Sequence, residues 1–169
     1  ADWIVWSKDL TQSGTNGPET FALNQTTAPS SAGMLYATPT ASAFTTYQYG
    51  ATNASGDNYI AYLFASVDGI SKIGSYTGTG YDLNVDCGFS AGARFVLIRR
   101  TDSTGDWYLY DSERGIVAGN DPYVRVNTSN AEVTNTDYID PLSSGFTVTS
   151  SAPADLNASS GTYIFLAIA

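Results

Sequence analysis

Short runs of β-branched and aromatic residues alternate along the chain with clusters of Gly, Ser, Asn and Thr. No stretch keeps apolar residues at helical i, i+3, i+4 spacing, so long helices are not expected. The pattern predicts an all-β protein, an antiparallel β-sandwich of jelly-roll or lectin-like type that forms a single domain over residues 1–169. The expected strands are 3–7, 19–23, 44–49, 58–66, 71–76, 83–88, 93–101, 107–111, 123–127, 145–149 and 162–169. A brief helical turn is expected within residues 134–142.

Three of the expected strands are apolar almost without interruption. They contain residues 62–65, 95–98 and 163–169. A strand with this pattern is typical of the middle of a sheet that is covered on both faces. We therefore expect all three to be buried.

The chain also repeats itself. The sequence DWIVW at residues 2–6 resembles DWYLY at residues 106–110, and NAS followed by YI recurs at 53–60 and 157–164. Both echoes have the same offset of 104 positions, and such internal similarity indicates a duplicated unit. We expect repeats over roughly 2–65 and 106–169, related by a pseudo-twofold axis and joined by bridging strands within 66–105. Trp3 and Trp107 are expected to be matching core residues beside that axis.

The charge of the chain excludes one class of partner. Of its 169 residues only 7 are Lys or Arg, and the net charge is −9, which argues against a nucleic-acid partner. The densest group of cations comprises Arg94, Arg99, Arg100 and Arg114, which could form a local basic cluster. We expect neighbouring acidic residues to form ion pairs with these arginines and so to neutralise the cluster.

The absence of histidine removes several kinds of chemistry. With His 0, the chain cannot form a Ser-His-Asp or Cys-His nucleophile or an imidazole zinc site by itself. The lone Cys87 allows no intrachain disulfide and is expected to be buried. No apolar run is long enough to span a membrane, so we expect no membrane insertion. The missing initiator Met suggests a processed product or a piece of a longer polypeptide.

Carboxylates are the remaining groups for catalysis. Glycan hydrolases use two acidic groups across one cleft, and the nearest candidates here are Asp106, Asp111 and Glu113. The alternative interpretation is a solvated cluster paired with arginine, which we favour. No catalytic residue is therefore assigned.

Oxygen ligands alternate at Asp82, Asn84 and Asp86, as in a calcium-binding loop. The glycine expected next is displaced by Cys87, and no glutamate follows at the usual distance. In a strand, the same residues would form one solvated face while Leu83 and Val85 point inward. These three residues are weak calcium candidates, and no cofactor is otherwise expected.

Aromatic side chains could bind sugar. Trp and Tyr faces stack on sugar rings, and neighbouring polar groups bind the hydroxyls. Trp6 and Tyr110 are expected to lie on the outward face of their strands, opposite the core tryptophans. With Asp111 and Arg114 they form the candidate ligand-binding set.

Several segments of the chain together form an ordered series of motifs: 3–6, 8–10, 53–56, 59–65, 72–80, 88–89, 95–101, 106–107, 111–112 with Arg114, 145–146, 157–159 and 163–164. In this order they resemble a β-sandwich repeat domain of unknown function in tail-fibre and other virion proteins of marine tailed bacteriophages. The resemblance covers essentially the whole chain. It supplies no catalytic residues.

This resemblance implies a non-enzymatic virion structural protein, either a tail-fibre module or a capsid or tail decoration subunit. It would lie on the virion surface, outside the cell, and contact the host surface. Its partners would be other virion proteins and further copies of itself, as a trimer or higher homo-oligomer. Two alternatives stay open: a lectin-like carbohydrate-binding module for host surface glycan, and a polysaccharide depolymerase.

Overall fold

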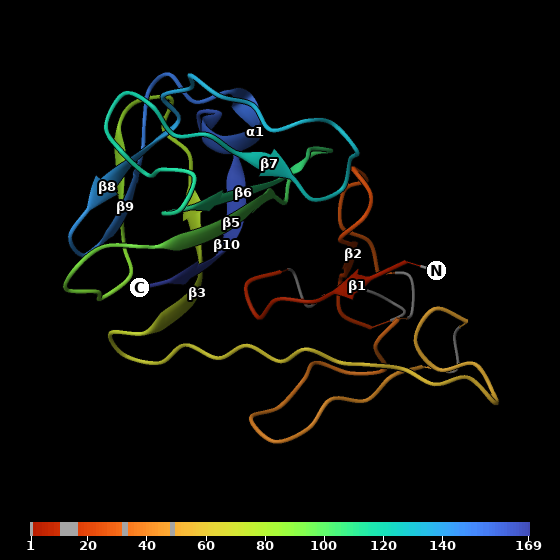
Figure 1. The fold of residues 1–169 in the computed structure, drawn as a ribbon. Coiled ribbons are helices and arrows are strands. Elements are labelled where there is room, and N and C mark those ends of the chain that lie inside the picture. The colour runs from red at the N-terminus through yellow and green to blue at the C-terminus, as the bar shows by residue number, and fades with distance from the viewer. Residues whose placement is uncertain (1, 11–16, 32–33, 48–49) are drawn as a thin grey trace.

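The computed structural model describes residues 2–10, 17–31, 34–47 and 50–169. Its regular secondary structure consists of antiparallel strands and one short helix, joined by long loops (Figure 1). The strands are β1 (Ile4–Val5), β2 (Phe21–Ala22), β3 (Ser71–Thr77), β4 (Leu83–Asp86), β5 (Phe95–Arg100), β6 (Trp107–Asp111), β7 (Val124–Arg125), β8 (Ile139–Leu142), β9 (Gly145–Val148) and β10 (Thr162–Ile168). The helix is α1 (Ala154–Asn157). The all-β prediction is confirmed.

Two sheets form the sandwich. One has five strands in the order β3-β10-β5-β6-β7, and the other has three in the order β4-β9-β8. Alternation along the strands turns one side of each towards the other sheet. The main core lies between them and includes Val96, Tyr110, Phe146 and Phe165.

A two-stranded hairpin, β1-β2, lies outside the sandwich. It contacts the outer face of the five-stranded sheet through a second apolar cluster. We call residues 2–10 and 17–31, which contain β1 and β2, the hairpin region. Its residues Phe21 and Leu10 pack there with Trp107 and Ile164 from the sheet. In Figure 1 the red and orange first part of the chain lies to one side of the green and blue sandwich.

Strand positions agree closely with prediction in residues 71–169. The predicted strands at 71–76, 107–111, 145–149 and 162–169 correspond to β3, β6, β9 and β10. The predicted helical turn within 134–142 is wrong, because β8 forms there and pairs with β9. For the predicted strand 44–49, an isolated bridge joins Thr46 to Leu35, and positions 48 and 49 lie outside the described residues.

The segment 58–66 differs most from expectation. Within the described part of the chain, no ladder includes residues 58–65, which we call the open strand. Leu63 is 79% exposed and Tyr62 is 67% exposed, so the prediction of a buried strand at 62–65 is wrong. The corresponding predictions for 95–98 and 163–169 are supported, since Val96, Ile98, Tyr163 and Ala167 are fully buried.

The two tryptophans also have different environments. Trp107 is 3% exposed, whereas Trp3 is 53% exposed and stacks on Tyr62, with ring centroids 6.1 Å apart. The prediction that they are matching core residues is therefore wrong for Trp3. The strands of 66–105 pair with β6, β9 and β10, all from the second half.

Among the described residues, no helix has the length and apolar character needed to cross a membrane.

Candidate functional site

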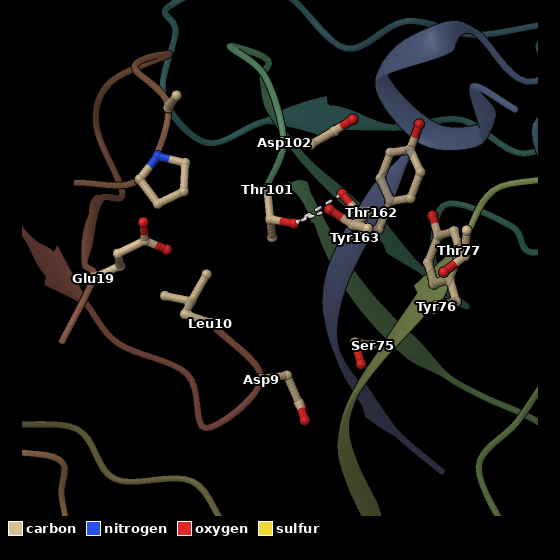
Figure 2. Close-up of a pocket in the computed structure, with 12 residues that line it drawn as sticks. Asp9, Leu10, Glu19, Ser75, Tyr76, Thr77, Thr101, Asp102, Thr162 and Tyr163 are labelled. Atoms are coloured by element: carbon tan, nitrogen blue, oxygen red, sulfur yellow. Dashed lines mark hydrogen bonds between the residues drawn. The ribbon is translucent and has the colours of Figure 1, made fainter. Parts of the chain in front are cut away.

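A groove of about 670 Å³ separates the hairpin region from the outer face of the five-stranded sheet (Figure 2). Asp9, Leu10 and Glu19 lie on the hairpin side of this groove. The opposite side comes from β3, β10 and the turn after β5. Its lining residues there are Ser75, Tyr76, Thr77, Thr101, Asp102, Thr162 and Tyr163.

Strand register explains the polar character of the sheet side. Thr162, at the start of β10, is paired with Thr77 at the end of β3, and Ile164 is paired with Ser75. Alternation puts these residues on the outer face, while Tyr163 between them points to the core. The hydroxyls of Thr101 and Thr162 are 2.6 Å apart and share a hydrogen bond, which Figure 2 shows. The floor is thus made of hydroxyl groups.

Three carboxylates border the groove. Asp9 accepts a hydrogen bond from Lys8 at 2.7 Å. Asp102 accepts one from Arg100 at 2.7 Å, and this bond lowers the pKa of Asp102. Glu19 has no ion-pair partner among the described residues. Such a groove offers hydrogen-bond acceptors to a hydroxyl-rich ligand, and no Lys or Arg is among the described residues that line it.

The predicted ligand-binding residues do not form one site. Tyr110 is fully buried between the sheets, with its ring 5.7 Å from that of Tyr123. The prediction that Tyr110 faces outward is therefore wrong: the inner face of β6 carries Tyr108 and Tyr110, and its outer face carries Trp107. Trp6 is half-buried and follows β1, outside the sandwich.

Asp111 and Arg114 do lie together, in the turn after β6. The Asp111 carboxylate accepts hydrogen bonds from the backbone N–H groups of Glu113 and Arg114, at 3.1 and 2.9 Å, and pairs with the Arg114 guanidinium. Arg114 also lies 3.6 Å from Glu132. These bonds hold the turn, and neither residue lines the groove.

The calcium candidates have separate partners. Asp82 accepts a bond from Ser150 N–H, Asn84 from the Thr147 hydroxyl, and Asp86 from Gly88 N–H. All three are exposed and alternate with half-buried Leu83 and buried Val85, as expected for one solvated face of a strand. The described residues contain no group of three His, Cys, Asp or Glu side chains placed to hold a metal ion.

The arginine cluster is also divided. Arg94 lies 3.7 Å from Glu113 and Arg100 pairs with Asp102, as expected for neutralised surface cations. Arg99 is instead fully buried, 5.1 Å above the Phe21 ring, and donates a hydrogen bond to Thr27 O at 2.6 Å. Burial lowers the pKa of Arg99. Arg99 thus fastens the hairpin region to the sheet.

Cys87 is buried, as predicted. Burial raises the pKa of its thiol to about 11, so the reactive thiolate is scarce at neutral pH.

Sequence reasoning missed the most unusual surface of the molecule, which is the open strand. Ile60, Tyr62, Leu63 and Phe64 are all exposed on it. In Figure 1 this yellow stretch runs as an extended chain towards β3. The signal was present in the sequence as a continuous apolar run, but such a run does not say whether partner strands are available.

Comparison with known proteins gives one match. A family model described as "Domain of unknown function (DUF7483)" matches residues 1–169. Neither the search of curated proteins nor the search of solved structures found a match. The chain therefore belongs to the DUF7483 family.

Proposed function

We propose that the protein is a non-enzymatic structural module of a bacteriophage particle, which acts by assembling with other polypeptide. The observation that carries this proposal is the open strand, where four large apolar side chains are exposed in a row of five residues. Exposed apolar patches of this kind mark interaction surfaces. An unpaired extended segment also offers backbone N–H and C=O groups to an added strand.

The resemblance to tail-fibre and other virion proteins supports a position on the particle surface. In this proposal the module belongs to a tail fibre or decorates the capsid or tail, and its partners are other virion proteins. Symmetric copies, as a trimer or higher, remain part of the proposal. Contact with the host surface belongs to it as well.

Immunogold electron microscopy tests this function. Antibodies raised against the chain should label tailed particles at regular positions, on the fibre, tail or capsid. Label that stays with cells or with soluble protein, and is missing from the particles that carry the gene, contradicts the proposal.

Glycan binding is the second candidate, and the groove favours it. Its hydroxyl floor and the carboxylates of Asp9 and Glu19 suit a ligand rich in hydroxyl groups. If this is correct, a glycan array should show binding that the double variant Asp9→Asn, Glu19→Gln weakens at least about tenfold, the effect of losing roughly 1.4 kcal/mol of hydrogen bonding. Asp57→Asn, at an exposed position that does not line the groove, is the matched control.

A polysaccharide depolymerase stays a prediction, and in this groove its catalytic carboxylates would not be Asp106, Asp111 or Glu113. The carboxylates that line the groove are Asp9, Glu19 and Asp102, while Asp111 is bound within its own turn.

A further inference from the structure

The same hydrogen-bond arrangement occurs at the start of both halves. Trp3 N–H donates to the Asn24 side-chain oxygen at 3.2 Å, and the Asn24 amide donates to Asp2 at 3.1 Å. In the second half, Trp107, Asn127 and Asp106 make the same two bonds, each at 2.8 Å. The backbone repeats as well, because Trp3 O accepts from Leu23 N–H and Trp107 O accepts from Val126 N–H.

A second arrangement recurs near the end of each half. The Tyr163 hydroxyl accepts from Ala158 N–H at 2.7 Å and donates to Ala154 O at 2.6 Å. The Tyr59 hydroxyl accepts from Ala54 N–H at 2.8 Å and donates to Gly50 O at 3.1 Å. The spacing along the chain is identical, and the offset between the two sets is again 104.

Backbone pairings between these points also correspond. The bridge of Thr20 with Ser30 matches that of Tyr123 with Val133. The bridge of Leu35 with Thr46 matches Tyr138 and Thr149, whose backbones bond next to the β8-β9 ladder. All of these correspond at an offset of 103, in the same order along the chain. The hydrogen bonds and backbone bridges described for residues 2–59 thus correspond, in the same order, to those of residues 106–163.

The two halves differ in what surrounds the strand that follows. After Tyr163, β10 lies between β3 and β5 and pairs with both along its length. After Tyr59, the open strand pairs with no strand in the described part of the chain, and Ile60 is 74% exposed while its counterpart Ile164 is 5% exposed. Both neighbours of β10 come from residues 66–105. The first half has no counterpart of that segment among the described residues.

We propose that the first half is an incomplete copy of the second, and that the open strand is an acceptor for two strands of the β3 and β5 type. The partner to which we commit is a segment with the character of residues 66–105, joined in tandem ahead of the first half as residues 66–105 are joined ahead of residue 106. This inference rests on the proposed function only in treating the open strand as a protein-binding surface.

Side-chain chemistry on the open strand fits such a partner. Tyr59 and Ile60 are identical to Tyr163 and Ile164 of the paired strand. Ala61 stands at the place of Phe165, whose ring lies 2.8 Å from where a Cβ at Gly74 would be. A smaller residue at 61 therefore leaves room for a β3-type strand. A partner with alternating apolar residues, as Val96 and Ile98 in β5, would bury the remaining side chains.

A grafting experiment tests the proposal. A second copy of residues 66–105 is fused directly ahead of residue 2, so that the new junction repeats the one between 105 and 106. Hydrogen exchange is then followed by mass spectrometry at residues 58–65, with β10 as an internal standard for folding. We expect exchange at 58–65 to slow by about 100-fold relative to the unfused chain, since local protection reports the stability of the pairing.

The matched control carries Val96→Asp and Ile98→Asp in the added copy only, and should leave 58–65 unprotected. A synthetic peptide of residues 93–104, added to the unfused chain, gives the same readout without a fusion and should slow exchange as well. The proposal is overturned if neither the fusion nor the peptide protects 58–65. It is also overturned if the unfused chain already protects them in a concentration-dependent way, because a second copy would then be the partner. Particle labelling is independent of both results, so this inference and the proposed function can fail separately.

Discussion

Trp3 and Trp107 show how one local motif leads to two different environments. Both N–H groups bind an asparagine side chain in the same way. Trp107 is covered, because the Phe21 ring packs against it in a T-shaped arrangement with ring centroids 5.6 Å apart, and Ala22 O accepts a hydrogen bond from its indole N–H at 3.2 Å. Each of the hydrogen bonds to asparagine joins residues of the same half of the chain, whereas the burial of Trp107 depends on residues of the other half. From the sequence both tryptophans were expected in the core, and the structure confirms this for Trp107 alone.

Replacement of the two tryptophans separates these roles. Trp107→Ala should lower the free energy of unfolding by about 3–5 kcal/mol, because it removes a large buried side chain. Trp3→Ala should cost less than about 1 kcal/mol, since half of that side chain is already in water. Urea denaturation measures both. Equal losses for the two variants would contradict the environments described above.

Asp121 is a buried carboxyl whose protonation links stability to pH. Its oxygens accept hydrogen bonds from Tyr138 N–H at 3.0 Å and Ile139 N–H at 3.1 Å. Burial nevertheless raises the pKa of Asp121 to about 7. An unfolded Asp has a pKa of about 4, so between about pH 4 and 7 the folded chain binds more protons than the unfolded chain. Stability from this group is therefore complete below about pH 4 and is lost as the pH rises through 7.

Asp121→Asn should remove this dependence, because the amide stays neutral throughout the range. We expect the free energy of unfolding of the parent chain to carry a falling component between about pH 4 and 7, and the variant to lack it. Urea titrations at several pH values provide the measurement, with exposed Asp57→Asn as control. An unchanged slope in the Asp121 variant would show that the carboxyl is ionised in the folded chain.

At the scale of elements, strands were predicted correctly where turn-forming residues flank the apolar run and so mark its two ends. β6 occupies the predicted residues, and β3 and β10 differ from them only at their ends. β8 was missed because Asp140 and Pro141 resemble a turn, yet Pro141 is tolerated since β8 is an edge strand. Helix α1 is only four residues long and has no periodicity to detect.

Candidate sites were harder to predict than strands. The alternation at 82–86 gave the solvated face correctly, because it depends on one strand alone. The groove combines two hairpin-region carboxylates with hydroxyls from β3 and β10, which are far apart in sequence. Tyr110 was assigned to the wrong face, because alternation separates the two faces of β6 without saying which of them meets the second sheet.

The pairing of β4 with β9 depends on a glycine. A Cβ at Gly145 would lie 2.1 Å from Val85 O and 3.0 Å from Cys87 N, both backbone atoms that cannot move independently. Gly145→Ala should therefore separate the strands and cost about 1–3 kcal/mol of stability.

Gly50→Ala is the matched control for that glycine, since no described residue other than its chain neighbours comes within 4 Å of the added methyl group. Its effect should stay within about 0.5 kcal/mol. Thermal or urea unfolding compares the two variants. A Gly145 variant as stable as the control would mean that β4 and β9 are not in close contact.

At the scale of the whole molecule, the chain divides into a closed part and an open part. Residues 71–169 contribute every strand of the two sheets that form the sandwich. The first part adds a hairpin, fastened by Arg99 and Trp107, and the exposed aromatic pair Tyr36 and Tyr47. Exposed apolar surface is therefore concentrated before residue 71. A domain that binds a further polypeptide segment exposes such a surface, whereas a domain that folds alone buries most of it.

Residue-resolved hydrogen exchange on the unmodified chain tests this division most directly. Amides of β10 should exchange only through large-scale opening, whereas amides 60–64 should exchange at nearly the rate of an unstructured peptide, because no described strand pairs with them. Protection at 60–64 equal to that of β10, at a dilution where the chain is monomeric, would mean that the open strand is already paired and would contradict the account.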